Sequence, residues 1–457
     1  MSQLILTDFV ETTSKQFNIP GVAVGVWADG KEVYTCHGVT SVDNPLPIYQ
    51  DTLFLVASVT KTFTATTLMR LVAEGQVELN APLRRYVPEF RLKAQQAADH
   101  VTVLHLLNHT SGLDWRVNAD TGEGDDALAR AVAKMAEMEL IAPPGTRVSY
   151  SQAGYNLLGR IIEKVTGVAF EQAVAQLLLE PLGLSHSFFA RDDIMTQRFV
   201  VGHNPGSDGT LSIARPWRHA RGDNPGGGLA TSVTDLLRFA RFHLGDGRAE
   251  SGALVLPTRV LQQMKEPTAV LQASNLGDAI GLGWFLRDVG GVRTVGHGGS
   301  ANGQFAELLL VPERHFAVVS LSNAGPGGIP FNQAVVSFAL ENYLRLVDRD
   351  PEPIPFDAAR AQEIAGNYEN TIMTFAVDTV GGRLRLALRI KPEIRAAAEK
   401  APPPDPEPTE FGLLPGNRDE YIITSGEFKG YRGFFTRDTS GAVVGVDLGG
   451  RFFSRVQ

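Results

Sequence analysis

Residues 52–75 read TLFLVASVTKTFTATTLMRLVAEG. Residues 52–57 are mainly apolar, and from Thr60 onward apolar side chains recur at helical spacing until Gly75, which is a stop signal for a helix. The pattern predicts a buried helix over residues 60–74 and places Ser58 in its first turn.

Ser58 and Lys61 form the one Ser-x-x-Lys sequence in the chain. Positions i and i+3 share one face of a helix, so the two side chains are expected to meet. A serine hydroxyl is a weak nucleophile unless a neighbouring base takes its proton, and a desolvated lysine amine can do so. A helix N-terminus also directs N–H groups at a developing oxyanion. The alternative is that Ser58 only caps the helix and Lys61 is a solvated charge.

The elements around this stretch predict one discontinuous α/β domain. An amphipathic helix within residues 1–20 precedes a hairpin of strands 21–27 and 32–37, which an Asp-Gly turn joins. The middle of the chain is mainly helical. Helices are predicted at residues 101–107, 127–139, 155–165, 170–179 and 233–244. Strands return at residues 283–289, 292–296, 304–312 and 316–322, before a helix at 332–346.

The last quarter of the chain reads as a separate small β domain. Residues 348–355 (DRDPEPIP) begin a linker, for which we set the bounds 348–363 between domains at 1–347 and 364–457. Short β-type runs at 374–379, 384–390, 420–423, 431–436 and 442–448 predict a small β-barrel or sandwich. Residues 401–409 (APPPDPEPT) are too rich in proline for an inner strand and predict a long excursion.

Composition excludes several classes of function. A net charge of −8 provides no footprint for nucleic acid or for an anionic membrane, and no apolar run of transmembrane length occurs. The single cysteine, Cys36, cannot form an internal disulfide and reads as a small buried hydrophobe. His105 and His109 lack the glutamate of a zinc hydrolase motif between them, so we predict no metal site. No G-x-G-x-x-G motif of a dinucleotide enzyme occurs, and we predict no cofactor. No signal peptide is evident, which makes the cytoplasm the expected location unless a leader was removed.

Two further segments carry candidate site residues. Residues 143–159 (PPGTRVSYSQAGYNLLG) place Tyr150 just before a helix, where its phenol can serve as a proton shuttle. Residues 295–303 (VGHGGSANG) predict a strand whose glycines allow close approach of a substrate backbone, with the N–H of Ser300 as an oxyanion donor. The alternatives are a tyrosine at the edge of the core and a glycine-rich turn with a surface histidine.

These motifs resemble, in order, those of the serine β-lactamase and penicillin-recognising family, in its class C and D-aminopeptidase/esterase branch. The resemblance covers residues 1–347. It rests on Ser58-x-x-Lys61, Tyr150-Ser151-Gln152 and His297-x-Gly299, with secondary matches at 109–113 (HTSGL) and from 226 to 239 (GGGL, then SVTDLLRF). The implied fold is a mixed sheet flanked by helices with an all-helical insertion, followed by the C-terminal barrel.

The resemblance implies a role for each residue. Ser58 is then the acylated nucleophile, Lys61 and Tyr150 transfer protons, and the backbone N–H groups of Ser58 and Ser300 form the oxyanion hole. Gln152, His297 and Gly299 bind substrate. Two departures affect substrate choice. Gln152 stands where many relatives have Asn, and His297 replaces a permanently cationic Lys, which weakens recognition of a free carboxylate.

The expected activity is hydrolysis of an amide or ester through an acyl-enzyme, on a small molecule or a short peptide. A D-aminopeptidase-like peptidase or amidase comes first. A carboxylesterase and a weak β-lactamase or D-Ala-D-Ala carboxypeptidase remain alternatives, and a non-catalytic ligand-binding relative is the alternative class. Residues 364–368 (IAGNY) resemble the start of a lipocalin-like domain, whose loop at 392–415 is a candidate to reach the active-site mouth. The sequence leaves the oligomeric state open, a homo-oligomer included.

Overall fold

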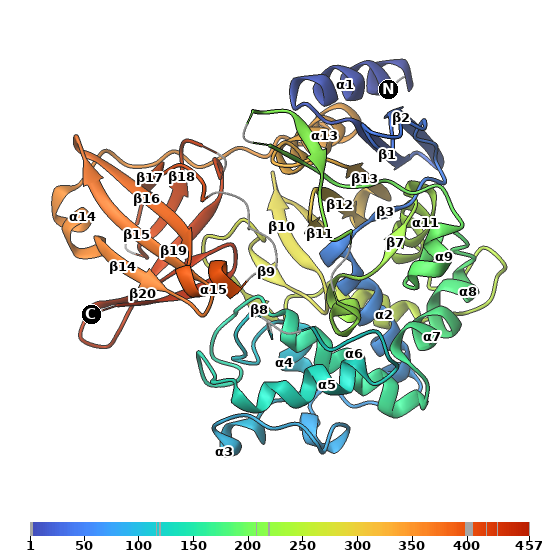
Figure 1. Ribbon diagram of the computed structural model, residues 1–457, viewed down its shortest axis with the longest axis horizontal. Coiled ribbons are helices and arrows are strands. Elements are labelled where there is room, and N and C mark those ends of the chain that lie inside the picture. The colour runs from blue at the N-terminus through green and yellow to red at the C-terminus, as the bar shows by residue number, and fades with distance from the viewer. Residues whose placement is uncertain are drawn as a thin grey trace. The chain divides into compact units, whose positions relative to one another are not determined.

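The computed structural model divides the chain into two compact units (Figure 1). It describes residues 3–115, 117, 120–206, 208–217, 220–397, 405–416, 418–426 and 428–456. The first unit comprises Met1–Gly145, Ser151–Ala269 and Ala279–Asp348, and the second comprises Thr146–Tyr150, Val270–Asp278 and Arg349–Gln457. Each unit is described by itself below.

An eight-stranded sheet forms the centre of the first unit, in the order β2-β1-β13-β12-β11-β10-β9-β8. The strands are β1 (Gly21–Ala28), β2 (Lys31–Gly38), β8 (Ala269–Val270), β9 (Ala279–Ile280), β10 (Phe285–Val289), β11 (Val292–Ala301), β12 (Gln304–Val311) and β13 (Phe316–Ser322). All the pairings from β2 through to β9 are antiparallel. The N-terminal hairpin therefore joins the C-terminal strands through β1 and β13, as a discontinuous domain requires.

Helices cover both faces of this sheet. On one face, α1 (Gln3–Gln16) and α13 (Gly328–Ala339) share a hydrophobic cluster with β1 and β13. The larger cluster on the other face contains α2 (Thr60–Ala73), α6 (Gln152–Thr166) and α11 (Val233–Leu244). The remaining helices of the unit are α3 (Gln95–Ala98), α4 (Val103–Leu107), α5 (Ala127–Ala133), α7 (Phe170–Val174), α8 (Glu180–Leu182), α9 (Arg191–Met195), α10 (Asn224–Gly227) and α12 (Thr258–Met264). The predicted mixed fold with a helical middle is confirmed.

Small sheets complete the first unit. Three two-residue strands, β3 (Phe54–Leu55), β4 (Ser187–Phe188) and β7 (Ala230–Thr231), pair in the order β3-β7-β4. A second pair joins β5 (His203–Pro205) to β6 (Leu211–Ile213). The β3 strand ends just before Ser58, so its pairing with β7 fixes the chain that leads to the predicted nucleophile.

The second unit is built on a closed barrel of eight consecutive antiparallel strands. They are β14 (Gly366–Glu369), β15 (Met373–Val380), β16 (Arg383–Ile390), β17 (Thr409–Leu413), β18 (Glu420–Ile423), β19 (Arg432–Arg437), β20 (Val443–Leu448) and β21 (Arg451–Arg455). The prediction missed β14, β17 and β21, which are short and carry charged or glycine residues. Buried aromatic side chains fill the interior: Tyr368, Phe375, Phe411, Tyr421, Phe435 and Phe453.

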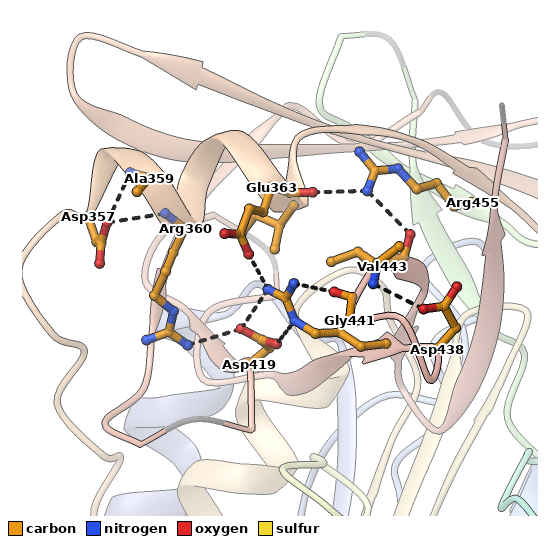
Figure 2. Close-up of polar contacts among 12 residues, drawn as sticks. Asp357, Ala359, Arg360, Glu363, Asp419, Asp438, Gly441, Val443 and Arg455 are labelled. Atoms are coloured by element: carbon orange, nitrogen blue, oxygen red, sulfur yellow. Dashed lines mark hydrogen bonds and ion pairs between the residues drawn. The ribbon is translucent and has the colours of Figure 1, made fainter.

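A short helix, α14 (Ala358–Ile364), packs on the core of the barrel through Ala361 and Ile364. It occupies the last part of the stretch predicted as a linker. Figure 2 shows the polar contacts around Glu363 of this helix and Asp419 of the barrel domain. Arg437 donates to both Glu363 and Asp419, at 2.6 Å in each case. Because Arg437 lies on β19, these contacts attach the helix to the barrel wall.

The proline-rich excursion at 392–415 is described only in part. Its start forms α15 (Pro392–Ala397) and its end forms β17, while residues 398–404 lie outside the described residues. A role of this loop at the active-site mouth stays a prediction.

Candidate active site

Ser58 lies in a one-turn 3-10 helix, Ala57–Val59, that leads directly into α2. This differs slightly from the predicted first turn of the α-helix itself. Ala57 has a positive φ of 46°, a conformation that costs free energy for any residue with a Cβ. Strain of this kind next to a half-buried serine is typical of functional sites, where surrounding structure holds the backbone in place.

Lys61 is fully buried on α2 and its ammonium nitrogen contacts the Ser58 hydroxyl. The Nζ–Oγ distance is 3.4 Å. Nζ also donates to Oε1 of Gln152 at 2.9 Å and to the carbonyl oxygen of Gly226 at 2.7 Å. These three groups are neutral, and the predicted nucleophile and base lie next to each other, with Lys61 shielded from solvent.

Gln152 connects Lys61 to the start of α6. Its Oε1 accepts from Lys61, and its Nε2 donates to Oδ1 of Asn156 and to the carbonyl of Asp223, both at 3.0 Å. Both amide hydrogens of Gln152 therefore have acceptors within the protein. The prediction that Gln152 binds substrate stays a prediction, and the structure places the residue as a support for Lys61.

The HTSGL loop positions the beginning of α6. His109, at a φ of 59°, accepts through Nδ1 from the backbone N–H of Ser151 at 3.1 Å. Ser151 in turn caps α6 by accepting from the N–H of Gly154. The contact between His109 and Ser151 was not foreseen, because it joins positions 42 apart in the sequence. His105 completes the capping box of α4 by accepting from the backbone N–H of Thr102 at 3.3 Å.

Strand β11 brings the His-x-Gly motif against the nucleophile. A Cβ on Gly299 would lie 2.1 Å from the carbonyl oxygen of Val56 and 3.1 Å from the backbone nitrogen of Ser58. Only glycine allows this close approach. Ser300 follows on the same strand and pairs with Phe305 of β12. The oxyanion role of the N–H groups of Ser58 and Ser300 stays a prediction, supported by this juxtaposition.

His297 is buried and neutral. Its ring lies 4.5 Å from that of Phe285, and Nδ1 lies 2.7 Å from the carbonyl oxygen of Gly298. Burial, together with the charge of Lys61, lowers the pKa of His297 to about 3. A carbonyl oxygen only accepts, so Nδ1 carries the hydrogen and Nε2 is an acceptor. The site thus lacks a cation at this position throughout the physiological pH range.

Tyr150 belongs to the second unit, although Ser151, the next residue, belongs to the first. Its side chain is buried, and its backbone N–H donates to the carbonyl of Gly450 at 2.7 Å. Its predicted role in proton transfer stays a prediction.

Gly226 is a site residue that sequence reasoning missed. A Cβ there would lie 2.1 to 2.3 Å from three atoms of the Gln152 amide. The Gly226→Ala variant is expected to acylate about 100-fold more slowly, because Gln152 and Lys61 must move away from Ser58. The measurement is the rate constant for reaction with a fluorophosphonate.

Gly227→Ala is the matched control for this change. Both residues lie in α10, but the nearest atom to a Cβ on Gly227 is the Ala57 carbonyl carbon at 3.9 Å. We expect it to react as fast as the wild type. Equal rates for the two variants would contradict the assignment of Gly226 to the site.

Glu307 lies on β12 opposite Gly298 of the motif strand. Burial raises its pKa to about 7. When folding raises the pKa of a carboxyl group, the protein's free energy of unfolding falls as the pH rises from the pKa of the unfolded state towards that of the folded state. The loss persists at higher pH. Its side chain keeps some exposure, so Glu307→Gln is expected to raise the free energy of unfolding by ~1 kcal/mol at pH 8.

The pH dependence of that gain distinguishes a titration effect from a packing effect. The difference in the free energy of unfolding between Glu307→Gln and the wild type is expected to vanish at pH 4.5, where the carboxyl group of Glu307 is protonated in the folded protein. Urea unfolding at both pH values measures it, with the exposed Glu313→Gln as control. A gain of the same size at both values would contradict the expectation.

Two other kinds of feature are absent from the described residues. No group of three or more His, Cys, Asp or Glu side chains is arranged to hold a metal ion there. No helix in that part of the chain is both long and apolar enough to cross a membrane.

The chain as a whole is similar to several known proteins. The family model described as Beta-lactamase matches residues 6–334. Penicillin-binding protein 4 of Amycolatopsis lactamdurans is 33% identical over 365 residues, which are 78% of this chain and 94% of that protein. The crystal structure of SurE has a TM-score of 0.77 at 26% identity and covers 99% of both chains, and SurE is also known in a structure with D-Leu. The octameric penicillin-binding protein homologue from Pyrococcus abyssi has a TM-score of 0.65 at 25% identity over 98% of both chains.

Proposed function

The chain belongs to the beta-lactamase family, whose members are serine hydrolases that act through an acyl-enzyme, and we propose that it is a peptidase or amidase acting on D-amino-acid derivatives. In this proposal Ser58 attacks the carbonyl carbon and passes its proton to the pair of Lys61 and Tyr150. Tyr150 returns a proton to the departing amine. Water, activated by the same pair, then releases the acid and restores Ser58.

The observation that carries the peptide-like substrate is an open strand beside the nucleophile. The pairing of β10 with β11 ends at Phe285 and Gly296, whereas β11 continues to Ala301. Over residues 297–301 the described chain gives β11 a strand partner only on its β12 side. Since a Cβ added to Gly299 would lie only 3.1 Å from the backbone nitrogen of Ser58, this stretch runs beside the nucleophile, and an extended substrate can pair with β11 and present its carbonyl to Ser58.

A cationic Lys at the position of His297 would bind a carboxylate of the substrate. Because His297 is neutral, it favours a substrate that has no carboxylate there. Penicillins carry such a carboxylate, so a β-lactamase is the less favoured activity. The structure of SurE with D-Leu supports D-stereochemistry.

One observation favours a carboxylesterase as the second candidate. The amide hydrogens of Gln152 point to Asn156 and Asp223, which removes a donor for a substrate amide. An activated ester depends less on such a contact, because its leaving group departs more readily than an amine.

The test compares kcat/KM for the p-nitroanilides of D-Leu and L-Leu, a p-nitrophenyl ester and benzylpenicillin. We expect the D-anilide to exceed the L-anilide about 100-fold, which the contacts of one stereocentre can supply, and benzylpenicillin to acylate slowly. Turnover of the ester with no anilide hydrolysis would replace the amidase with the esterase. Acylation without product release would identify a binding protein.

Two further points remain proposals. We place a hydrolase domain at residues 1–347 and a lipocalin-like domain at 364–457. The octameric homologue from Pyrococcus abyssi supports a homo-oligomer for this chain, which light scattering at several concentrations would test.

A further inference from the structure

The segment Thr146–Tyr150 packs with the barrel, although the chain on both sides of it belongs to the other unit. We call these five residues the Tyr150 segment. It ends at Tyr150, and the next two residues are Ser151, which caps α6, and Gln152, which binds Lys61. A displacement of this segment would therefore move both the first residues of α6 and Tyr150, the proposed proton shuttle.

Arg147 anchors the Tyr150 segment on the barrel wall. Its guanidinium lies 3.8 Å from the ring centroid of Phe452 and donates to the hydroxyl of Thr436 at 2.9 Å. Burial lowers the pKa of Arg147, and burial raises the pKa of the neighbouring Asp447 to about 7. Stacking of a buried guanidinium on an aromatic ring is a strong and directional contact.

Tyr150 itself is held by the turn between β20 and β21. The carbonyl of Gly450 accepts from the Tyr150 N–H at 2.7 Å, and the guanidinium of Arg451 lies 5.4 Å from the centroid of the Tyr150 ring. Gly449 and Gly450 both have positive φ, at 63° and 69°. The turn thus contacts the backbone and the ring of the same tyrosine.

Space around the turn is limited on the side away from Tyr150. A Cβ on Gly450 would lie 2.2 Å from Cδ1 of Leu276 and 3.6 Å from Cβ of Tyr150. Leu276 belongs to Val270–Asp278, the other segment that packs with the barrel. Gly450 is therefore confined between Leu276 and Tyr150, and a larger residue there must displace one of them.

We infer that Gly450 and Arg451 are positioning residues for Tyr150, the proposed proton shuttle. This rests on the proposed function of Ser58, Lys61 and Tyr150. Proton transfer requires the phenol oxygen within hydrogen-bond distance of its partner, and a displacement of ~1 Å costs about 100-fold in rate.

The first experiment uses Gly450→Ala with Gly441→Ala as its matched control. Gly441 precedes β20, has a φ of 89° and would have no atom within 4 Å of an added Cβ, so its substitution carries backbone strain without a clash. We expect kcat to fall at least ~10-fold in Gly450→Ala with KM nearly unchanged, and Gly441→Ala to match the wild type. Equal kcat values in the two variants would overturn the inference.

The second experiment is a double-mutant cycle between Arg451 and Tyr150. Arg451→Met is expected to lower the fluorophosphonate acylation rate ~10-fold, and Arg451→Lys to recover part of it, because an ammonium can also lie over the ring. In a Tyr150→Phe background, Arg451→Met should have no further effect. An equal loss in that background would show that Arg451 acts independently of Tyr150, which overturns the inference.

Failure of the proposed function gives a different result. If the wild-type protein is not labelled at Ser58 under any condition, the assignment of the site fails. The positioning inference fails when Ser58 is labelled and either Gly450→Ala behaves as Gly441→Ala or Arg451→Met causes the same loss in the Tyr150→Phe background as in the wild type.

Discussion

Ser58→Ala is expected to reduce fluorophosphonate labelling of the protein to background and to abolish turnover of every ester and amide substrate. The hydroxyl of Ser58 is the group beside the buried Nζ of Lys61, and an alanine offers no oxygen for an acyl-enzyme. Loss of an enzyme's nucleophile lowers kcat by about 10⁶-fold where it has been measured in serine hydrolases. Intact-mass measurement followed by peptide mapping of the wild-type adduct identifies the labelled residue.

Ser300→Ala provides the control for this experiment. Ser300 lies on β11 beside the site, but its proposed contribution is the backbone N–H, which alanine retains. We expect labelling of this variant at close to the wild-type rate. A wild-type adduct on any residue other than Ser58 would contradict the assignment.

Lys61→Met is expected to slow acylation at least ~1000-fold, because general-base assistance of this size is lost when the proton acceptor is removed. Methionine preserves the length and the burial of the side chain. It leaves the Gly226 carbonyl and Oε1 of Gln152 without their ammonium donor, so some loss of thermal stability accompanies the change. Stopped-flow labelling measures the rate, and circular dichroism establishes that the variant is folded.

The control for charge loss is Lys164→Met. Lys164 is partly exposed on α6 and pairs with Glu89 at 3.2 Å, on the surface of the same unit. Its substitution should leave the labelling rate within about twofold of wild type, since exposed ion pairs contribute little. A folded Lys61→Met protein that reacts as fast as Lys164→Met would remove Lys61 from the mechanism.

Elements with strong local patterns were predictable from the sequence. The helix α11 has the predicted bounds because its apolar residues repeat at the helical period, and the strand β13 has them because it is a short continuous apolar run. The hairpin of β1 and β2 follows from an Asp-Gly turn between two β-rich runs. Short strands such as β14 and β21 were missed, since their pairing in a closed barrel, rather than their own residues, makes them strands.

The proposed catalytic pair was also accessible to sequence reasoning. Lys61 follows Ser58 by three positions in a helix-forming stretch, and helical geometry alone brings such side chains to one face. The β-lactamase family and the mixed α/β fold followed from the order of the motifs, and both are confirmed.

Only the tertiary structure decided what surrounds that pair. The carbonyl of Gly226 reaches Lys61 across 165 positions of sequence, and the amide of Gln152 turns inward to Asn156 and Asp223. Tyr150 lies against the barrel turn at Gly450, 300 positions later in the chain. The sequence by itself determined the local periodicities and the chemical groups at short spacing, because both depend on neighbouring residues. Burial, backbone acceptors and the partners of Tyr150 depend on contacts between distant segments, which form only when the chain folds.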